Sequence, residues 1–201
     1  VGDTKTVDMG SLGTHTLRVA NTTKCSEVTV ESKTACGFVL EFADIVEVRV
    51  MNSLGGHEGG WPTMELNEYL NNQIYELLPE GLRNAIIDTT VVSGHGSTSG
   101  ETNFTSTDKL YLLSTREVWG NCTGGTNDAA GCYDYGSSNT VTRQLDYYES
   151  KGVVTSDSSK YKEAIKLING SNQWWWLRSA ISNTGDYFRG VYSDGYYSYS
   201  T

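Results

Sequence analysis

The feature that most constrains the fold of this chain is a run of three tryptophans, Trp174-Trp175-Trp176, followed by Leu177. Each tryptophan buries roughly 150–250 Å² when it packs, so three of them are costly to leave in water. In an extended chain, successive side chains point to opposite faces. Trp174 and Trp176 then face one way, and Trp175 and Leu177 face the other. Because both faces are apolar, we predict a central strand that is covered on both sides.

Arg178 is the charged residue that directly follows this apolar run. A buried charge is costly unless it is paired and hydrogen-bonded. We therefore expect a carboxylate, or several carbonyl oxygens, around the guanidinium of Arg178. We interpret this arginine as structural rather than catalytic.

The segment after Ser179 has a different composition from the rest of the chain. Residues 180–201 are almost entirely Tyr, Ser, Gly, Asp, Asn and Thr. Antibody recognition loops have this composition, because Tyr supplies a stiff amphipathic contact and Ser, Gly and Asn supply adaptable hydrogen bonds. Asp194-Gly195 is a strong hairpin signal, so an edge hairpin explains the segment equally well. The two interpretations are compatible if a hairpin frame carries exposed aromatic positions.

Length and charge limit the classes of partner. With 201 residues the chain can form one domain with a sizeable core. The formal net charge is −9 and no Lys or Arg cluster is visible, so nucleic acid and an anionic membrane surface are not expected partners. No apolar run approaches the ~18 residues that a membrane span needs. No signal peptide is visible and residue 1 is Val, so we interpret the chain as a mature product or a piece of something longer.

The four cysteines fall into two local pairs, Cys25 with Cys36 and Cys122 with Cys132. Neither spacing is typical of a zinc site. Two loop-closing disulfides would indicate an oxidising compartment. Reduced and buried cysteines are the alternative interpretation.

The hydrophobic pattern predicts short strands, few helices and long loops. We expect a β-hairpin over residues 2–20 and strands over 37–43, 45–50, 87–92 and 108–114. We expect a first helix that opens at Trp61, a short helix after Pro79, and further helices over 140–150 and 158–168. Ser114 and Glu117 form a capping box, which predicts that a helical turn carrying Val118 and Trp119 begins at Ser114. The mixture indicates an α+β domain.

No constellation of reactive side chains stands out. His57 and Glu58 lie in a Gly-rich loop, and His95 would have to complete a metal site, but the spacing of the two histidines follows no known pattern. The histidines are too scattered for a convincing Ser-His-Asp order. We expect no catalytic residues, no metal ion and no cofactor.

Several motifs occur in an order that resembles a known family. They are Val1-Gly2-Asp3-Thr4, then Ala35-Cys36-Gly37-Phe38-Val39-Leu40-Glu41-Phe42, Trp61 with Tyr69-Leu70-Asn71-Asn72, Thr107-Asp108-Lys109-Leu110-Tyr111-Leu112-Leu113-Ser114, Trp175-Trp176-Leu177-Arg178-Ser179 and Val191-Tyr192-Ser193-Asp194-Gly195. Together they resemble the bacterial domain family of unknown function numbered 6273, which is found on surface proteins of gut Firmicutes and in some phage proteins.

The resemblance implies a C-type-lectin-like fold related to the formylglycine-generating, sulfatase-modifying enzymes. Relatives of that fold include the variable proteins of diversity-generating retroelements, in which the segment after the tryptophan-rich strand is diversified. Carried over to this chain, the frame residues are Trp61, Trp175, Trp176, Leu177, Arg178, Ser179, Phe188, Val191 and Gly195. The implied ligand-binding positions are Asn183, Asp186, Tyr187, Arg189, Tyr192, Tyr196, Tyr197 and Tyr199.

The chain departs from the family pattern in two places. Met64 and Asn67 stand where the family usually carries Ser and Arg in the first helix, which would loosen a buried network. The family also continues with a closing strand of the form Gly-Val-x-Pro-x-Phe, whereas this sequence ends at Thr201. We therefore expect one domain over residues 1–201 that either lacks its closing strand or has that strand supplied differently.

These features lead us to expect a non-enzymatic recognition or adhesion domain that presents its Tyr-rich C-terminal surface to a protein or glycan. Its place would be extracellular, on the bacterial cell surface, or alternatively on a phage virion. The alternative function is that of a structural, decoration or tip domain within a larger surface or virion assembly. A sulfatase-modifying enzyme is disfavoured, because no cysteine follows Cys132.

Overall fold

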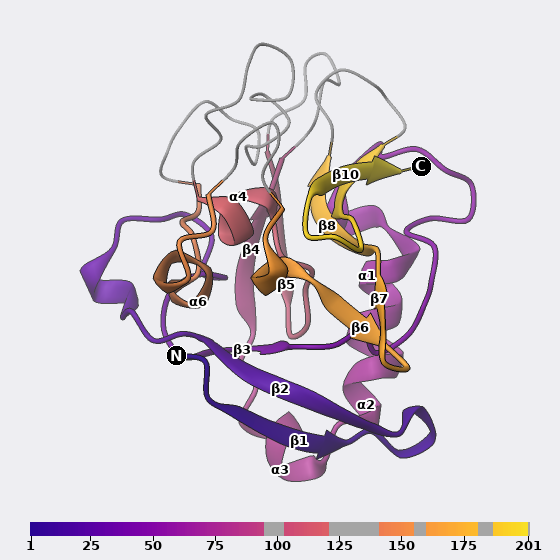
Figure 1. Cartoon of the computed structure of the whole chain (residues 1–201). Helices are drawn as coiled ribbons and strands as arrows, with labels where there is room; N and C mark the ends of the chain where they lie inside the picture. Colours follow the sequence, from indigo (N-terminus) through magenta and orange to yellow (C-terminus); the bar gives the residue numbers. More distant parts are fainter. Residues whose placement is uncertain (95–102, 121–140, 155–159, 181–186, 201) are drawn as a thin grey trace.

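The computed structural model describes residues 1–94, 103–120, 141–154, 160–180 and 187–200. The described strands form four small antiparallel sheets, and the described helices are short. The expectation of a mixed fold with short strands and few helices is therefore confirmed. In Figure 1 the N-terminal sheet lies toward the bottom, the helices after Trp61 run down the right side to the bottom, and the C-terminal sheet lies at the upper right.

The N-terminal sheet has the order β1-β2-β3. Its strands are β1 (Thr4–Asp8), β2 (Thr14–Asn21) and β3 (Val39–Phe42). A 3₁₀ turn, η1 (Gly10–Leu12), joins the first two strands and confirms the predicted hairpin. A second 3₁₀ turn, η2 (Cys25–Glu27), lies in the connection to β3.

The strand predicted over residues 45–50 is wrong. This segment pairs with none of the described strands, and Val48 and Val50 are 65% and 62% exposed. Its backbone groups bond elsewhere, because the Ile45 amide donates to the Leu167 carbonyl at 2.9 Å and the Arg49 carbonyl accepts from the Trp176 indole at 3.0 Å. The valine alternation thus belongs to an extended surface loop.

The helices that follow Trp61 form the predicted helical stretch. They are η3 (Trp61–Thr63), α1 (Glu65–Tyr69), the π-helical turn η4 (Leu70–Ile74), α2 (Tyr75–Leu77) and α3 (Glu80–Arg83). Leu66 and Ile74 are buried, as their helical spacing predicts. Ile74 packs with Val7 and Met9, so this stretch closes one side of the N-terminal sheet.

The second sheet pairs β4 (Thr89–Ser93) with β5 (Phe104–Asp108). The strand predicted over residues 108–114 is therefore wrong, since the paired strand ends at Asp108. Several backbone groups of residues 109–114 bond to side chains instead. Asn71 Oδ1 accepts hydrogen bonds from the amides of Lys109 and Leu110 at 2.8 and 3.0 Å. The Arg178 guanidinium donates to the carbonyl of Leu112 at 2.7 Å.

The third sheet is a hairpin of β6 (Lys166–Ile168) and β7 (Ser171–Gln173). It corrects the helix predicted over residues 158–168, because among the described residues of that range only the 3₁₀ turn η5 (Lys162–Ala164) is helical. Asn169 and Gly170 have φ values of 52° and 77°. An Asn-Gly pair with both φ values positive makes the tight turn that favours a hairpin over a helix.

Two described helices complete the core. The first, α4 (Thr115–Trp119), begins at Ser114 with the predicted capping box. The second, α6 (Asp146–Ser150), occupies the end of the helix predicted over residues 140–150. Leu145 and Tyr148 are fully buried and join Val118 and Trp119 in the largest apolar cluster.

The C-terminal sheet has the order β10-β9-β8. Its strands are β8 (Trp175–Ala180), β9 (Phe188–Val191) and β10 (Tyr197–Ser200). The tryptophan strand β8 is therefore an edge strand of its sheet, not the predicted central one. The first and last strands, β1 and β10, lie in different sheets at opposite ends of the molecule (Figure 1).

Candidate functional site

The tryptophan strand β8 is covered on both faces, as its sequence predicts. Trp175 and Leu177 are 8% and 0% exposed and belong to one apolar cluster. Trp176 faces a second cluster that contains Trp61 and Phe188. The alternation of an extended chain thus places β8 between two parts of the core. The outer edge of the strand is not open either, because the Arg178 amide donates to the Leu113 carbonyl at 2.9 Å.

Arg178 lies at the centre of a buried polar network. Its two terminal nitrogens donate to the two carboxylate oxygens of Glu117, each at 2.6 Å, and both side chains are fully buried. One terminal nitrogen also donates to the Leu112 carbonyl at 2.7 Å. The other lies 3.3 Å from the Thr34 hydroxyl. The predicted carboxylate and carbonyl partners are therefore both present.

Glu117 also belongs to the capping box at the start of α4. Its Oε2 accepts from the Ser114 amide at 2.9 Å, while the Ser114 hydroxyl accepts from the Glu117 amide at 3.2 Å. The capping box of α4 thus also fixes the carboxylate that Arg178 needs. Hydroxyl groups of Thr34 and Thr142 donate to Oε1. The pair satisfies the requirement that a buried ion pair also find hydrogen bonds for its remaining lone pairs.

The electrostatics of this network favour the charged forms. Burial alone raises the pKa of Glu117, but the charge of Arg178 and the hydrogen bonds from Arg178, Thr34 and Ser114 outweigh it and hold this pKa below its ordinary value. Burial raises the pKa of the nearby Tyr111 hydroxyl, and the negative charge of Glu117 raises it further. Tyr111 therefore remains a neutral phenol beside an ionised pair.

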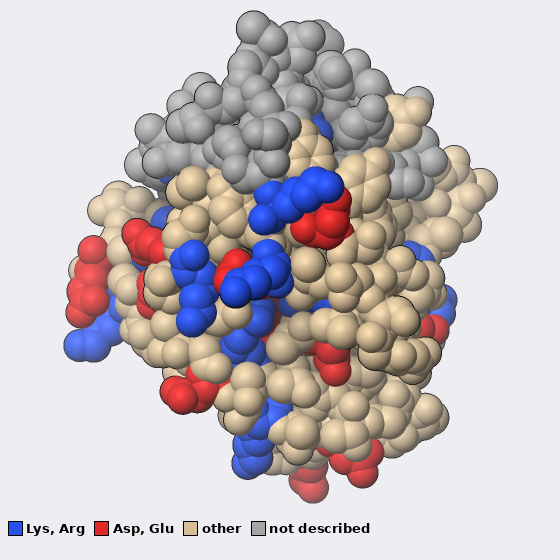
Figure 2. All heavy atoms as spheres, in the orientation of Figure 1, with Lys and Arg blue, Asp and Glu red and all other residues tan. Residues whose placement is uncertain are grey.

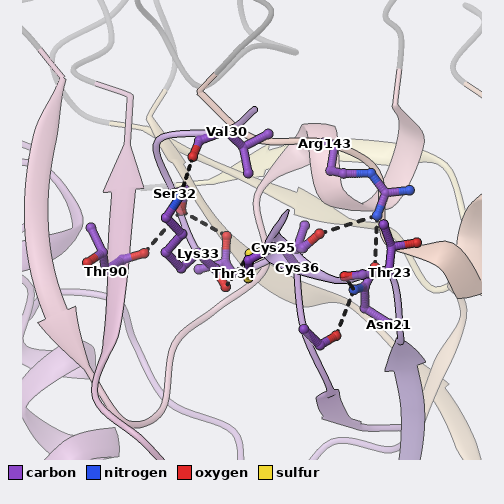
Figure 3. Close-up of a disulfide and its surroundings, with 12 residues drawn as sticks. Asn21, Thr23, Cys25, Val30, Ser32, Lys33, Thr34, Cys36, Thr90 and Arg143 are labelled. Atoms are coloured by element: carbon purple, nitrogen blue, oxygen red, sulfur yellow. Dashed lines mark hydrogen bonds between the residues drawn. A yellow bond between two sulfur atoms is a disulfide. The ribbon is translucent and has the colours of Figure 1, made fainter. Parts of the chain in front are cut away.

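A disulfide holds the loop that supplies Thr34. Cys25 and Cys36 are joined in the structure, which agrees with the first predicted pair. Cys122 and Cys132 lie outside the described residues. Figure 3 shows the disulfide between two sets of hydrogen bonds, with Ser32 and Thr90 on one side and Asn21 and Arg143 on the other.

The bonds in Figure 3 tie this loop to distant parts of the chain. The Lys33 amide donates to the Thr90 carbonyl at 2.7 Å. Arg143 donates to Asn21 Oδ1 at 2.9 Å and to the Ala35 carbonyl at 3.3 Å. The position of Thr34 is therefore fixed from both ends of the loop.

The C-terminal segment turns where the sequence predicts. The Gly195 amide donates to the Tyr192 carbonyl at 2.9 Å, and Gly195 has a φ of 82°. That φ suits glycine and strains other residues. The turn also closes on the body of the protein, because the Tyr161 amide donates to the Gly195 carbonyl at 3.3 Å. A Cβ at Gly195 would lie 2.0 Å from the Tyr161 carbonyl oxygen.

The predicted ligand-binding residues lie in different environments. Tyr192 is 48% exposed, and Tyr187 and Tyr196 are half-buried. Arg189 is only 2% exposed, so the structure places it inside the sheet rather than on the surface. Tyr197 and Tyr199 pair in β10 with Val191 and Arg189 of β9. Asn183 and Asp186 lie outside the described residues.

The frame residues inferred from the resemblance are buried or half-buried. Trp61, Leu177, Arg178 and Phe188 are at most 2% exposed, Trp175 is 8% exposed, and Trp176 is half-buried. The Trp61 indole donates to Asp108 Oδ2 at 2.9 Å. Asn67, one of the departures from the family pattern, donates to the same oxygen at 3.2 Å, so it takes part in a buried network here.

Trp174 and Trp176 form a pair of partly exposed rings beside the C-terminal sheet. The rings of Trp174 and Trp176 meet edge to face, with their centres 4.2 Å apart, and both are half-buried. Trp174 also covers Gly190 of β9, where a Cβ would lie 2.3 Å from the indole. The alternation of the run predicts that these rings share a face, but not that Gly190 leaves room for one of them.

The remaining chemistry-bearing groups support no metal centre among the described residues. His57 is 1% exposed and packs edge to face against Phe188, and His95 lies outside the described residues. No described group of three or more His, Cys, Asp or Glu side chains has the geometry to hold a metal ion. In the part of the chain that is described, no helix is long and apolar enough to cross a membrane.

Charged side chains on the surface are mixed in sign. Figure 2 shows Lys and Arg gathered in the middle of one face, with Asp and Glu beside them. One exposed ion pair joins Lys160 to Asp194 at 2.6 Å. It links the residues just before η5 to the turn between β9 and β10, which we call the tail turn. That contact and the Tyr161–Gly195 hydrogen bond both hold the turn of the C-terminal hairpin.

The sequence of the chain matches one known domain family. The model of a family described as Domain of unknown function (DUF6273) matches residues 38–201. The chain belongs to this family. The matched region includes β8, Glu117 and the whole C-terminal sheet, so the buried Arg178–Glu117 pair lies within the DUF6273 domain. No curated protein and no solved structure matches the chain significantly.

Proposed function

We propose that this DUF6273 protein is a non-enzymatic recognition domain that binds a protein or glycan through its C-terminal sheet. The observation that carries the proposal is a contrast within that sheet. Arg178 and Leu177 of β8 are fully buried, whereas Tyr192, at the turn after β9, is 48% exposed. A rigid base that carries partly exposed aromatic side chains is the arrangement by which recognition surfaces limit the entropy lost on binding.

Contacts on several sides support the base of this surface. The Arg178–Glu117 pair joins β8 to α4, and Lys160 and Tyr161 contact the tail turn. Tyr187 and Tyr196 flank Tyr192 as half-buried side chains that retain some exposed surface. The acidic net charge of −9 suits a neutral or basic ligand.

The finer assignment follows from the family resemblance. We propose a C-type-lectin-like fold, with the segment after Ser179 in the role of the variable region of diversity-generating retroelement proteins. The Cys25–Cys36 disulfide supports an oxidising location. We propose the bacterial cell surface, with a phage virion as the alternative.

The test is a binding screen on glycan and protein arrays. The native chain is compared with a variant in which Tyr187, Tyr192 and Tyr196 are changed to Ser. Phe38→Ser is the matched control, because Phe38 is an aromatic residue that is 71% exposed outside the C-terminal sheet. Circular dichroism and thermal unfolding confirm that all three proteins fold.

The proposal expects binding by the native chain and the Phe38 variant, and loss of binding in the triple Tyr variant. Aromatic anchors commonly contribute about 2 kcal/mol or more each to an interface, so the loss should be large. Binding that survives all three substitutions would move the site away from the C-terminal sheet.

A second candidate function is a structural role in an assembly, and one observation favours it. Three apolar residues of the loop after β3 are strongly exposed: Val48 at 65%, Val50 at 62% and Leu54 at 93%. Exposed apolar patches often mark contacts between proteins. Light scattering after size-exclusion chromatography tests this candidate, because a Val48→Ser and Val50→Ser variant should dissociate an assembly that these side chains stabilise.

A further inference from the structure

A polar hollow of about 520 Å³ lies beside the first helix, on elements that do not belong to the C-terminal sheet. It is lined by residues of η3, α1 and the π-helical turn η4, by the end of β5, and by the residues that directly precede β4 and follow β5. The principal polar members are Asn67, Glu68, Asn72, Asp88, Asp108 and Lys109. Ligand sites commonly have volumes of about 300–1,000 Å³, so the hollow is large enough for a side chain or a small molecule.

Asp108 is the buried group of this hollow. It is 5% exposed, and the three hydrogen bonds that its side chain accepts from described residues all reach Oδ2. The donors are the Trp61 indole, the Asn67 amide and the Ser106 hydroxyl, at 2.9, 3.2 and 2.8 Å. Oδ1 accepts no hydrogen bond from any residue that the structure describes. A carboxylate that is this deeply buried is stabilised by a further donor.

The charge of the lining decides which donor fits. Glu68, Asp88 and Asp108 contribute three carboxylates, and Lys109 is the single cation among the described lining residues. None of the described lining residues carries an aromatic ring on which a sugar could stack. An excess of carboxylates without an aromatic platform favours a cation over a neutral saccharide.

The chain already holds one ammonium group at the rim. Lys109 Nζ lies 3.2 Å from Asp88 Oδ1 and 5.4 Å from the centre of the Tyr75 ring. This contact pairs Lys109 with Asp88 and leaves the charges of Glu68 and Asp108 without an ion-pair partner among the described residues. The hollow thus contains one ammonium group, that of Lys109, which is already paired with Asp88, and it has room for a second cation.

The backbone beside the hollow is also unusual. Asn72 lies in η4, where the helix widens into a π-helical turn over Leu70–Ile74. Such turns are rare and frequently occur at functional sites. Here the turn brings the side-chain amides of Asn71 and Asn72 to the same hollow. Asn71 is occupied with the amides of Lys109 and Leu110, so Asn72 is the amide available at the rim.

We propose that this hollow binds a cationic side chain of a protein partner, a Lys ammonium or an Arg guanidinium, with Asp108 as its buried acceptor. Glu68 and Asp88 supply the negative rim, and Asn72 supplies a hydrogen-bonding amide. This site is separate from the proposed C-terminal surface, and either can be present without the other.

The experiment uses Nα-acetyl-lysine N-methylamide as the probe and the uncharged Nα-acetyl-norleucine N-methylamide as its match. Binding to the whole chain is followed by amide chemical shifts in NMR spectra. The proposal expects saturable shifts at residues 67, 72, 88 and 108 with the lysine probe and none with the norleucine probe. A single exposed side chain should bind weakly, with a Kd of about 1–50 mM. The corresponding arginine derivative shows which cation is preferred.

The informative variant changes only the rim, with Glu68→Gln and Asp88→Asn together, and leaves the hydrogen bonds to Asp108 intact. We expect it to weaken binding about threefold to tenfold, because rim charges contribute modestly. Glu27→Gln is the control, an exposed carboxylate paired with Lys24 elsewhere on the chain. The triple Tyr variant of the C-terminal sheet should bind the probe unchanged.

Three results would overturn the proposal. One is equal binding of the lysine and norleucine probes, and another is unchanged binding by the rim variant. The third is an absence of saturable shifts up to about 50 mM probe. None of these results bears on the C-terminal surface, so failure of this site and failure of the proposed recognition function remain distinguishable.

Discussion

Arg178 and Glu117 form a two-pronged ion pair, 2.6 Å at each contact, with neither side chain exposed to solvent. The pair joins the tryptophan strand β8 to the helix α4, and the capping box of α4 fixes the orientation of the carboxylate. Because one of its oxygens also accepts from Thr34, the pair connects the C-terminal sheet to the disulfide-closed loop. The surface proposed for recognition thus rests on three separate segments of the chain.

Removal of the charge on Glu117 should strongly destabilise the fold. In a Glu117→Gln variant the guanidinium of Arg178 remains buried without a counter-charge, and breaking one partner of a buried pair typically costs about 3–5 kcal/mol. Urea unfolding at neutral pH measures the loss. Glu27→Gln, which removes a carboxylate from an exposed pair, should change the free energy of unfolding by less than about 1 kcal/mol. Equal losses in both variants would contradict the role assigned to the buried pair.

The acid dependence of stability should include a contribution from Asp146. Burial raises its pKa, but hydrogen bonds from the amides and hydroxyls of Thr22 and Thr23, and from Arg143, lower it to about 2 from an ordinary 3.8. Because the folded-state pKa lies below the unfolded one, the folded protein binds fewer protons at Asp146 near pH 3. The stabilisation is present above the ordinary pKa and is lost as the pH falls through about 2.

An Asp146→Asn variant isolates this contribution. We expect it to be less stable than the native chain at about pH 6 and to approach native stability as the pH falls toward about 2. Urea unfolding at several pH values gives the two curves, and Glu41 and Glu117 titrate in both proteins, so their effects cancel. A stability difference that stays constant from about pH 6 to pH 2 would show that the Asp146 charge is not responsible.

Parts of this architecture follow from the sequence because they depend on neighbouring residues. The capping box of Ser114 and Glu117 is a local pattern, and the tail turn follows from Asp194-Gly195. The need of Arg178 for a carboxylate is also clear from its position beside three tryptophans. What the sequence could not indicate is that Glu117, 61 positions away, supplies that carboxylate, because the pairing depends on tertiary packing.

The two wrong strand predictions share one physical cause. Residues 45–50 and 109–114 have strand-like composition, yet side chains of Trp176, Asn71 and Arg178 bond to their backbone groups. Periodicity cannot distinguish a segment that pairs with another strand from one that bonds to side chains. The polar hollow around Asp108 was missed for a related reason, since its residues come from separate segments, and only the tertiary fold brings them together.

Gly195 should be more sensitive to substitution than another glycine that has a positive φ but open space around it. Gly195→Ala strains a φ of 82° and also places a Cβ against the Tyr161 carbonyl oxygen, whereas Gly10→Ala strains a φ of 60° with nothing within 4 Å. We expect the Gly10 variant to lose about 1 kcal/mol of stability and the Gly195 variant to lose clearly more. Thermal unfolding compares them, and amide shifts of residues 187–196 report displacement of the hairpin. Equal losses would show that the turn yields to the added methyl group.

Loss of the Cys25–Cys36 disulfide should weaken the support of the C-terminal sheet. The bridge closes a loop of sequence separation 11, and a loop of this size stabilises a fold by about 3 kcal/mol. In a Cys25→Ser and Cys36→Ser variant the loop that carries Thr34 gains freedom, so the hydroxyl that donates to Glu117 is held less firmly. Urea unfolding measures the stability, and NMR shifts of the Arg178 guanidinium report the network. Mass spectrometry of the native chain after thiol alkylation first confirms that the bridge is formed. If the variant keeps native stability and native Arg178 shifts, the loop is held by the bonds of Asn21, Arg143 and Thr90 alone.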